Sequence, residues 1–351
     1  MAKVLIVTDA WLPQTNGVVR SLEAVGREMV AMGYEVSYLT PEGFWTFPMP
    51  TYPEIRLSVV TPPTIAGFVS RERPDHIHIA TEGPLGLLAR HISIEQGLAF
   101  TTSYHTRFPE YVAARLPIPV EWTYGFLRWF HAPAAATLVP TRSMVEELAS
   151  RGFDGLVEWT RGVDHSLFRP GPKSEFNDLP GPHLLYVGRV SVEKNIEAFL
   201  ALDMPGSKIV VGEGPALAEL KRAHPEVHFL GFRRGEALAA CYRSADVLVF
   251  PSRTDTFGNV VLEALASGTP VAAFPVTGPR DVLTDPKAGA LDEDLAAAVH
   301  RALSLSRDDA RAHALRFTWR RCAEIFAQVL VPTRPAHAPQ LRPAAMLSHA
   351  A

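Results

Sequence analysis

The chain has 351 residues, 47% of them hydrophobic and 20% charged, and its 34 basic and 37 acidic side chains give a formal net charge of -3. This is the composition of a globular protein, and the length exceeds what one hydrophobic core usually fills, so we expect two domains. The balanced charge argues against a nucleic-acid partner, and two cysteines without C-x-x-C spacing argue against a disulfide scaffold or a zinc site.

The amino-terminal half reads as alternating strands and helices. Residues 4–7 form the short apolar run of a buried parallel strand, and a loop rich in Pro, Asn and Gly leads to Gly17. Apolar residues at helical spacing then continue to Gly33. Further strands are expected at residues 35–40, 75–79, 98–102 and 136–139. This order predicts an open parallel sheet with helices on both faces.

The same alternation restarts in the second half. Residues 169–182 are rich in Pro and Gly and have no periodicity, which predicts a linker. Strands are then expected at 183–187, 208–211, 227–230, 246–250 and 270–274, with helices at 215–223, 259–267 and about 308–330. The sequence therefore predicts two doubly wound domains, residues 1–168 and 183–330, the last helix of which can cross back to the first domain, and a disordered tail at 331–351.

Several motifs are absent from the sequence. It contains neither G-x-G-x-x-G nor G-x-x-x-x-G-K-[ST], which counts against a dinucleotide redox enzyme and a P-loop phosphatase. No D-x-D ends a strand, so we predict no metal site. The first residues contain too few apolar side chains to form the core of a signal peptide. No stretch approaches the roughly 18 consecutive apolar residues that a membrane-spanning helix needs. We expect a cytoplasmic protein whose membrane contact is at most peripheral, on the inner face of the cell membrane.

The residues that follow the strands are the candidates for ligand binding, because ligands of open α/β sheets bind beyond the carboxyl ends of the strands. In the second half, Arg189 and Lys194 bring two cations to this edge, where they suit a diphosphate. Each of them taken alone is equally well an ordinary surface cation.

The segment PSRTDTFGNVVLEALASGTPV at residues 251–271 predicts a strand end, a loop and a helix that begins near Asn259. The free N–H groups and the positive end of the helix dipole at such a helix N-terminus form a binding site for an anion. Glu263 lies one turn inside the helix, where its carboxylate can accept hydrogen bonds from the vicinal hydroxyls of a ribose. The alternative is a carboxylate that only complements the helix terminus or faces solvent.

Two features of the first half point to the same cleft. The loop before Gly17 can present backbone N–H groups to the phosphates. His105 follows the strand at 98–102, where a histidine can hydrogen-bond a sugar hydroxyl or assist proton transfer. A loop histidine with satisfied hydrogen bonds is the alternative.

Together these motifs resemble the retaining glycosyltransferases of family 4, which have the GT-B fold of two facing Rossmann-like domains, over about residues 1–330. The E-x7-E signature of that family appears here as Asp255 and Glu263, with an aspartate one methylene shorter than the usual glutamate. The segments SYHTRF around His105, RGVD at 161–164, GR-x4-K at 188–194 and GEGP at 212–215 support the resemblance.

The resemblance implies a role for each matched residue. Arg189 and Lys194 would bind the diphosphate of a nucleotide sugar, and Glu263 its ribose. Asp255 would hold the transferred sugar, and His105 would lie near the reaction centre. The sugar and phosphates would also contact the backbone from Phe257 onward, at Gly258, Asn259 and Val260, and the loop at Gly17. No metal and no cofactor are implied.

The acceptor is indicated by composition alone. Residues 104–131 combine eight aromatic side chains with arginines, a mixture suited to a membrane interface, although these aromatics would equally well form the core of the first domain. The chain looks most like bacterial members that glycosylate lipids. We therefore expect transfer from UDP-glucose or UDP-glucuronate to diacylglycerol, with a GDP-mannose-dependent mannosyltransferase as the alternative. An epimerase or phosphorylase of the same fold, and a two-lobed binding protein without catalysis, are competing hypotheses.

Overall fold

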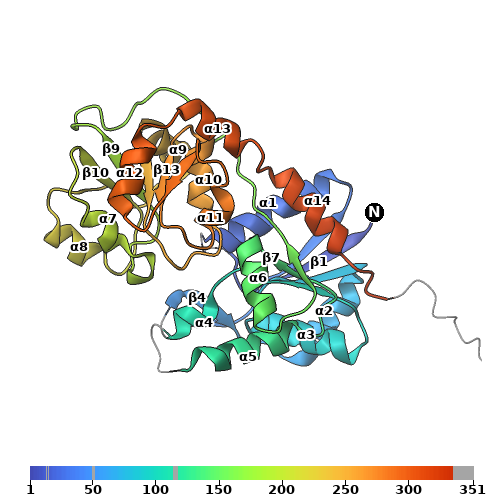
Figure 1. The fold of residues 1–351 in the computed structure, drawn as a ribbon. Helices are drawn as coiled ribbons and strands as arrows, with labels where there is room; N and C mark the ends of the chain where they lie inside the picture. Colours follow the sequence, from blue (N-terminus) through green and yellow to red (C-terminus); the bar gives the residue numbers. More distant parts are fainter. Residues whose placement is uncertain (13, 15, 50–51, 114–117, 335–351) are drawn as a thin grey trace, which may run out of the picture.

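The structure, a computed structural model, describes residues 1–12, 14, 16–49, 52–113 and 118–334. In these ranges the chain forms two six-stranded parallel sheets, one in each half, with helices packed around them (Figure 1). These sheets confirm the predicted fold class of two doubly wound units.

The first sheet has the strand order β2-β1-β5-β6-β7-β8. An antiparallel hairpin, β3 with β4, stands apart from it and was missing from the sequence prediction. The strands are β1 (Lys3–Val7), β2 (Glu35–Leu39), β3 (Thr46–Met49), β4 (Tyr52–Ser58), β5 (His76–Ile79), β6 (Thr101–Ser103), β7 (Thr137–Val139) and β8 (Leu156–Glu158), and the helices are α1 (Gly17–Ala31), α2 (Pro62–Glu72), α3 (Pro84–Glu95), α4 (Phe108–Ala113), α5 (Val120–His131) and α6 (Arg142–Ser150).

The second sheet has the order β11-β10-β9-β12-β13-β14. Its strands are β9 (His183–Val187), β10 (Ser207–Val211), β11 (His228–Phe229), β12 (Val247–Phe250), β13 (Val271–Ala273) and β14 (Gly289–Leu291). The 3-10 turn η1 (Val192–Lys194) and the helices α7 (Ile196–Leu200), α8 (Leu217–Ala223), α9 (Gly235–Ser244), α10 (Asn259–Ala266), α11 (Pro279–Val282), α12 (Leu295–Leu303), α13 (Arg307–Ala314) and α14 (Trp319–Val329) accompany them.

Burial explains why the strands appear in the sequence as continuous apolar runs. All residues from Val4 to Val7 are fully buried, and β1 pairs in parallel with β2 on one side and β5 on the other. A parallel strand covered by helices on both faces needs apolar side chains at every position.

The strand order of the second sheet has its topological switch point between β9 and β12. The chain moves outward from β9 to β10 and β11, and then returns to β12 on the opposite side of β9. Connections on the two sides of such a switch point leave in opposite directions, which opens a crevice at the carboxyl ends of the two central strands. The residues after β9 and after β12 are the ones that the sequence nominated.

The long helix expected at about 308–330 is two helices. α13 packs against α10 with Ala310 and Ala314 in the second core, whereas α14 packs against α1 in the first (Figure 1). The side chain of Thr318 accepts a hydrogen bond from the Arg321 amide and starts α14. The break is needed because the two helices belong to cores of different halves.

Packing also shifts two boundaries expected from the sequence. Val163 and Phe168, expected in the first domain, lie in the core around the second sheet, whereas Trp159 is buried in the first. Residues 331–334, expected in the disordered tail, are fixed because Thr333 is buried and donates its amide to the Asp75 carbonyl. Residues 335–351 lie outside the described residues.

Candidate active site

The loops after β9 and β12 are tied together at the switch point. The Lys194 ammonium forms an ion pair with the Asp255 carboxylate, both partly buried. Next to it, the Asn195 side-chain amide donates to the Pro251 carbonyl at 2.9 Å. The cation expected to bind a diphosphate and the acid expected to hold a sugar are therefore direct neighbours.

The start of α10 depends on a glycine. Gly258 has a φ of 86°, and a Cβ there would lie 3.2 Å from Cζ of Phe250. A left-handed conformation and this close contact both favour glycine. The turn leaves the amides of Asn259 and Val260 without an acceptor within the described part of the chain, as expected for the first turn of a helix.

Glu263 lies inside the first turns of α10 and is only 7% exposed. Its Oε2 accepts a hydrogen bond from the Tyr242 hydroxyl at 2.8 Å, and its Oε1 lies 3.3 Å from Nη1 of Arg20. Burial raises the pKa of Glu263, while Arg20 and the Tyr242 hydrogen bond act in the opposite direction. The carboxylate therefore does not face solvent, and Tyr242 and Arg20 hold it in a fixed position.

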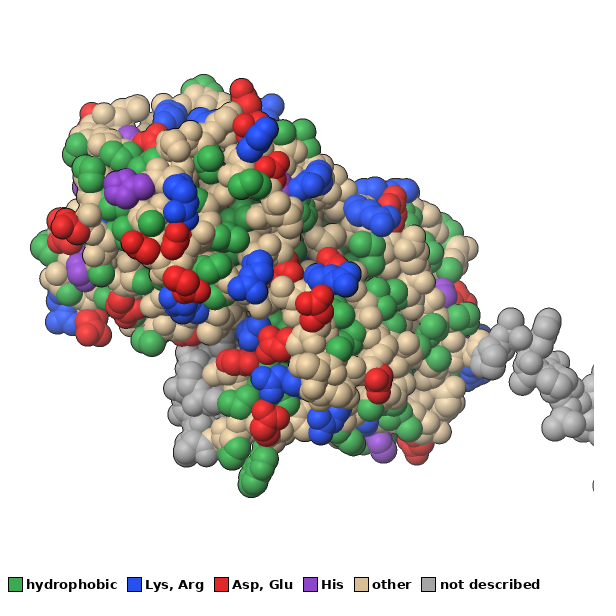
Figure 2. All heavy atoms as spheres, in the orientation of Figure 1, with side chains coloured by type: hydrophobic (Ala, Val, Ile, Leu, Met, Phe, Trp, Pro, Cys, Tyr) green, Lys and Arg blue, Asp and Glu red, His purple; other side chains and the backbone are tan. Residues whose placement is uncertain are grey.

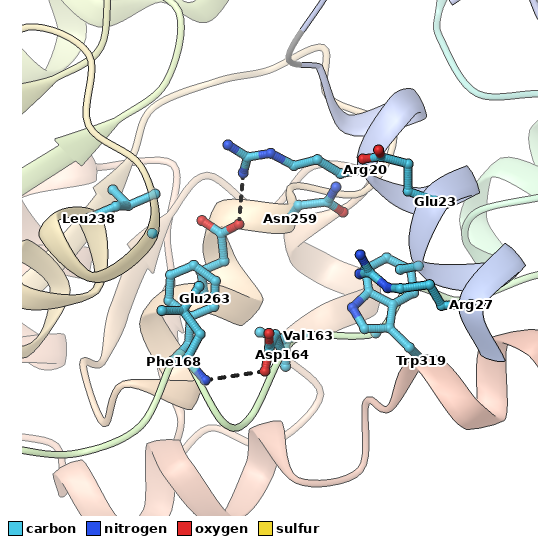
Figure 3. Close-up of a pocket in the computed structure, with 14 residues that line it drawn as sticks. Arg20, Glu23, Arg27, Val163, Asp164, Phe168, Leu238, Asn259, Glu263 and Trp319 are labelled. Carbon is cyan, nitrogen blue, oxygen red and sulfur yellow. Dashed lines mark hydrogen bonds and ion pairs between the residues drawn. The ribbon is translucent and has the colours of Figure 1, made fainter. Parts of the chain in front are cut away.

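A cavity of about 240 Å³ opens beside Glu263 (Figure 3). In Figure 3, Arg20 extends from α1 toward Glu263 across this space, so the cavity has walls from both halves of the chain. Charged and polar side chains in the wall include Arg20, Glu23 and Arg27 of α1, Asp164 of the connecting segment, and Asn259 and Glu263 of α10.

Gly17 brings the first half close to α10. The Asn16 side chain accepts hydrogen bonds from the amides of Val18 and Val19 and so starts α1 at Gly17. A Cβ on Gly17 would lie 3.1 Å from Nδ2 of Asn259. Two loops that the sequence assigned to opposite sides of a cleft thus approach each other directly.

His105 is held by hydrogen bonds at both ring nitrogens. An Nη2 donor of Arg161 lies 3.1 Å from its Nδ1, and Nε2 lies 2.8 Å from the Ser103 hydroxyl. Because a guanidinium can only donate, Nδ1 accepts and the proton is on Nε2. Its carbonyl accepts from the Thr256 hydroxyl at 2.9 Å, which links it to the loop after β12.

Burial, followed by the nearby Arg161 charge, lowers the pKa of His105 well below its ordinary value. Arg161 is itself buried, stacks on the Trp159 ring at 4.4 Å and donates to the Trp159 carbonyl, and burial lowers its pKa to about 10. Among the residues that the structure describes, it has no carboxylate partner. His105 is therefore a neutral ring in a fixed tautomer, which fits hydrogen bonding better than proton shuttling.

The expected site residues fall into three connected groups. Asn259 and Glu263 line the cavity, with Gly17 in contact with Asn259. Asp255 and Lys194 form the ion pair at the switch point, and His105 joins the same loop through Thr256. Gly258 and Val260 belong to the turn that begins α10, whereas Arg189 follows β9, and neither Arg189 nor Lys194 lines the cavity.

Sequence reasoning missed Arg20, Tyr242 and Arg161. Arg20 stands one helical turn after Gly17, a signal that could have found it. Tyr242 sits in an apolar stretch of α9 and carries no motif. Arg161 lies inside the quoted segment RGVD, but nothing in the sequence connects it with His105.

Comparison with known families gives matches to both halves. Residues 15–167 match the family described as Glycosyltransferase Family 4, and residues 181–308 match Glycosyl transferases group 1. A GDP-mannose-dependent alpha-mannosyltransferase of Mycolicibacterium smegmatis is 32% identical over 82% of this chain and 84% of its own length. An alpha-monoglucosyldiacylglycerol synthase of Streptococcus pneumoniae is 28% identical over 89% of this chain and 80% of its own.

Among solved structures, sucrose-phosphate synthase from Thermosynechococcus elongatus matches with a TM-score of 0.76 and 20% identity, over 94% of this chain and 98% of the other. At this identity the likeness establishes the fold alone.

Proposed function

Because the chain belongs to glycosyltransferase family 4 and has the GT-B fold, we propose that it moves a hexosyl group, with retention, from a nucleoside diphosphate sugar to a membrane lipid. In this reaction the bond between C1 of the sugar and the diphosphate oxygen breaks, and a bond from C1 to an acceptor hydroxyl forms on the same face. The hydroxyl proton passes to the leaving diphosphate.

The observation that supports this proposal most strongly is the buried carboxylate of Glu263 beside the cavity. It is one turn from amides that have no acceptor in the described chain, and it follows the loop that holds the Lys194–Asp255 pair. A ribose at the carboxylate and a diphosphate at the amides and cations would occupy adjacent positions, as they are joined in a nucleotide. Arg189 is assigned to the diphosphate on its position after β9.

We assign the sugar-binding role to Asp255 and to the residues around His105. The Asp255 carboxylate would accept a hydrogen bond from a sugar hydroxyl, either in place of its ion pair with Lys194 or with its second oxygen while the ion pair remains. Arg161 occupies Nδ1 of His105 and Ser103 accepts from Nε2, so Nε2 would exchange the Ser103 hydroxyl for a sugar hydroxyl when the donor binds. No metal enters this scheme, since the positive charge for the leaving group comes from side chains and amides.

For the donor we favour GDP-mannose over the UDP-sugars that the sequence alone suggested. The relative that is 32% identical across most of both chains is described as GDP-mannose-dependent. The relative described as a monoglucosyldiacylglycerol synthase keeps UDP-glucose as the second donor to test, with diacylglycerol as acceptor.

The test is a transfer assay with purified protein, vesicles of a bacterial lipid extract and one nucleotide sugar at a time. We expect a new glycolipid by mass spectrometry with GDP-mannose, formed equally well in excess EDTA, and none with Lys194→Ala. Lys208→Ala is the matched control, because Lys208 lies on β10 and donates to a backbone carbonyl. Donor consumption without acceptor, a requirement for inorganic phosphate, or nucleotide binding without turnover would contradict a transferase acting on lipid.

A further inference from the structure

Helix α5 exposes a row of large aromatic side chains that a helix of a globular protein would normally bury. Trp122, Phe126 and Trp129 are 75%, 37% and 52% exposed, and their spacing places them on one face. The opposite face supplies Tyr124, Leu127 and Phe130 to the interior. The core therefore does not need the outer aromatics, and their exposure calls for another partner.

We propose that the outer face of α5, formed by Trp122, Phe126 and Trp129, binds the surface of a lipid bilayer that carries anionic lipids. This inference rests on the lipid acceptor in the proposed function and identifies the part of the chain that reaches it. In the ranges that the structure describes, no helix has the length and apolar character to cross a bilayer. The contact would be interfacial, where tryptophan rings are favoured.

An exposed arginine on the same helix provides a positive charge for anionic headgroups. The Arg90 guanidinium lies 3.9 Å from the Trp129 ring and donates to the carbonyls of Trp129 and Phe130. Arg128, exposed on α5, donates to the Arg151 carbonyl at 2.8 Å. Neither Arg90 nor Arg128 has a carboxylate partner among the described residues. Arg128 is exposed and keeps an uncompensated positive charge on α5, where a long arginine side chain can reach headgroup phosphates. Arg90 is only 9% exposed and supports the Trp129 ring from the interior instead.

The α5 outer face is structurally continuous with the candidate reaction centre. The Tyr124 hydroxyl on the inner side of α5 donates to Glu110 of α4 at 2.7 Å. α4 follows the segment that contains His105, and Arg107 in that segment reaches Thr277 of the second half at 3.2 Å. In Figure 1, α4 and α5 lie along the lower edge, and Figure 2 shows hydrophobic side chains protruding there. A bilayer at this edge would present lipid beside the cleft.

A second copy of the chain fits this face less well. Stable interfaces bury about 800 Å² on each partner, far more than three side chains provide. A symmetric pairing through α5 would also place Arg128 of both copies at the same interface, with like charges close together. A bilayer has neither disadvantage.

The experiment measures flotation of the full chain with vesicles of phosphatidylcholine, with and without about one third phosphatidylglycerol. We expect the wild type to float with the anionic vesicles and the double variant Trp122→Ser/Trp129→Ser to lose at least about tenfold in partitioning. Trp45→Ser is the control, because Trp45 is 72% exposed near the β3–β4 hairpin. Arg128→Gln should weaken binding to anionic vesicles and leave binding to neutral ones unchanged.

Two further measurements make the outcome decisive. Brominated lipid should quench the fluorescence of wild type and Trp45→Ser more strongly than that of the double variant. Equal flotation of wild type and double variant overturns the proposal. The proposal is also overturned if light scattering shows a wild-type dimer, the double variant is a monomer, and the wild type does not bind vesicles. The assay contains no nucleotide sugar, so its result is separate from that of the transfer assay, and equal GDP affinity shows that the variants are folded.

Discussion

The replacement Glu263→Gln tests the ribose assignment most directly. A carboxylate has two oxygens with about four acceptor positions, and Tyr242 and Arg20 use one each, which leaves two for vicinal hydroxyls. Hydrogen bonds to a charged group contribute about 1.5–3 kcal/mol and neutral ones about 0.5–1.5, so an amide at this position loses about 1 kcal/mol at each hydroxyl. The total of about 2 kcal/mol corresponds to a roughly 30-fold weaker nucleotide affinity.

Calorimetric titration with GDP and with 2′,3′-dideoxy-GDP measures how much the two ribose hydroxyls contribute to nucleotide binding. In the wild type, removal of the two hydroxyls should weaken binding roughly 30-fold more than it does in Glu263→Gln, because about 2 kcal/mol is lost at these hydroxyls. The ratio is measured within each variant, so a general effect of the substitution on the fold cancels. Arg20→Met is the control, because it removes the ion pair and leaves the carboxylate. Equal ratios in wild type and Glu263→Gln would refute the assignment of Glu263 to the ribose.

Three further predictions follow from backbone geometry and titration. Gly258→Ala should lower the free energy of unfolding by about 1–3 kcal/mol in urea titrations, because it adds both backbone strain and a close contact with Phe250. Gly231→Ala, at φ 71° with open space around it, should lower this free energy only by the backbone strain. Arg161→Met raises the pKa of His105, so kcat/KM should fall at a higher pH on the acid side than in Arg161→Lys. Burial raises the pKa of Asp9 from 3.8 to about 6, so the folded state holds this proton more tightly. As the pH rises from about 4 to 7, the free energy of unfolding of the wild type should fall by about 3 kcal/mol relative to that of Asp9→Asn, as measured by urea titration.

Much of the framework could be predicted because its signals are local. A buried parallel strand needs an uninterrupted apolar run, and the residues after such runs must lie at one edge of the sheet. That logic correctly located the loop with Asp255 and the helix with Glu263. It also placed Lys194 at the same edge, where the structure joins it to Asp255.

The parts that could not be predicted depend on contacts between distant residues. Arg20 and Glu263 are 243 positions apart, and their ion pair depends on how the two halves face each other. Tyr242 looks like any core aromatic until its hydroxyl is seen to donate to Glu263. The apolar period around residues 308–330 continues across Thr318, so periodicity alone could not show that the two segments pack in different cores.

The segment from Asp255 to Glu263 links donor binding to the arrangement of the two halves. Its Thr256 hydroxyl donates to the His105 carbonyl, and its Glu263 carboxylate pairs with Arg20, so both ends of the segment contact the first half. The same segment contains the groups proposed to contact the sugar, the diphosphate and the ribose. Because Glu263 has acceptor positions for a ribose in addition to Arg20, binding does not require this ion pair to break. A bound nucleotide can therefore strengthen contact between the halves by adding its own bonds to those already present.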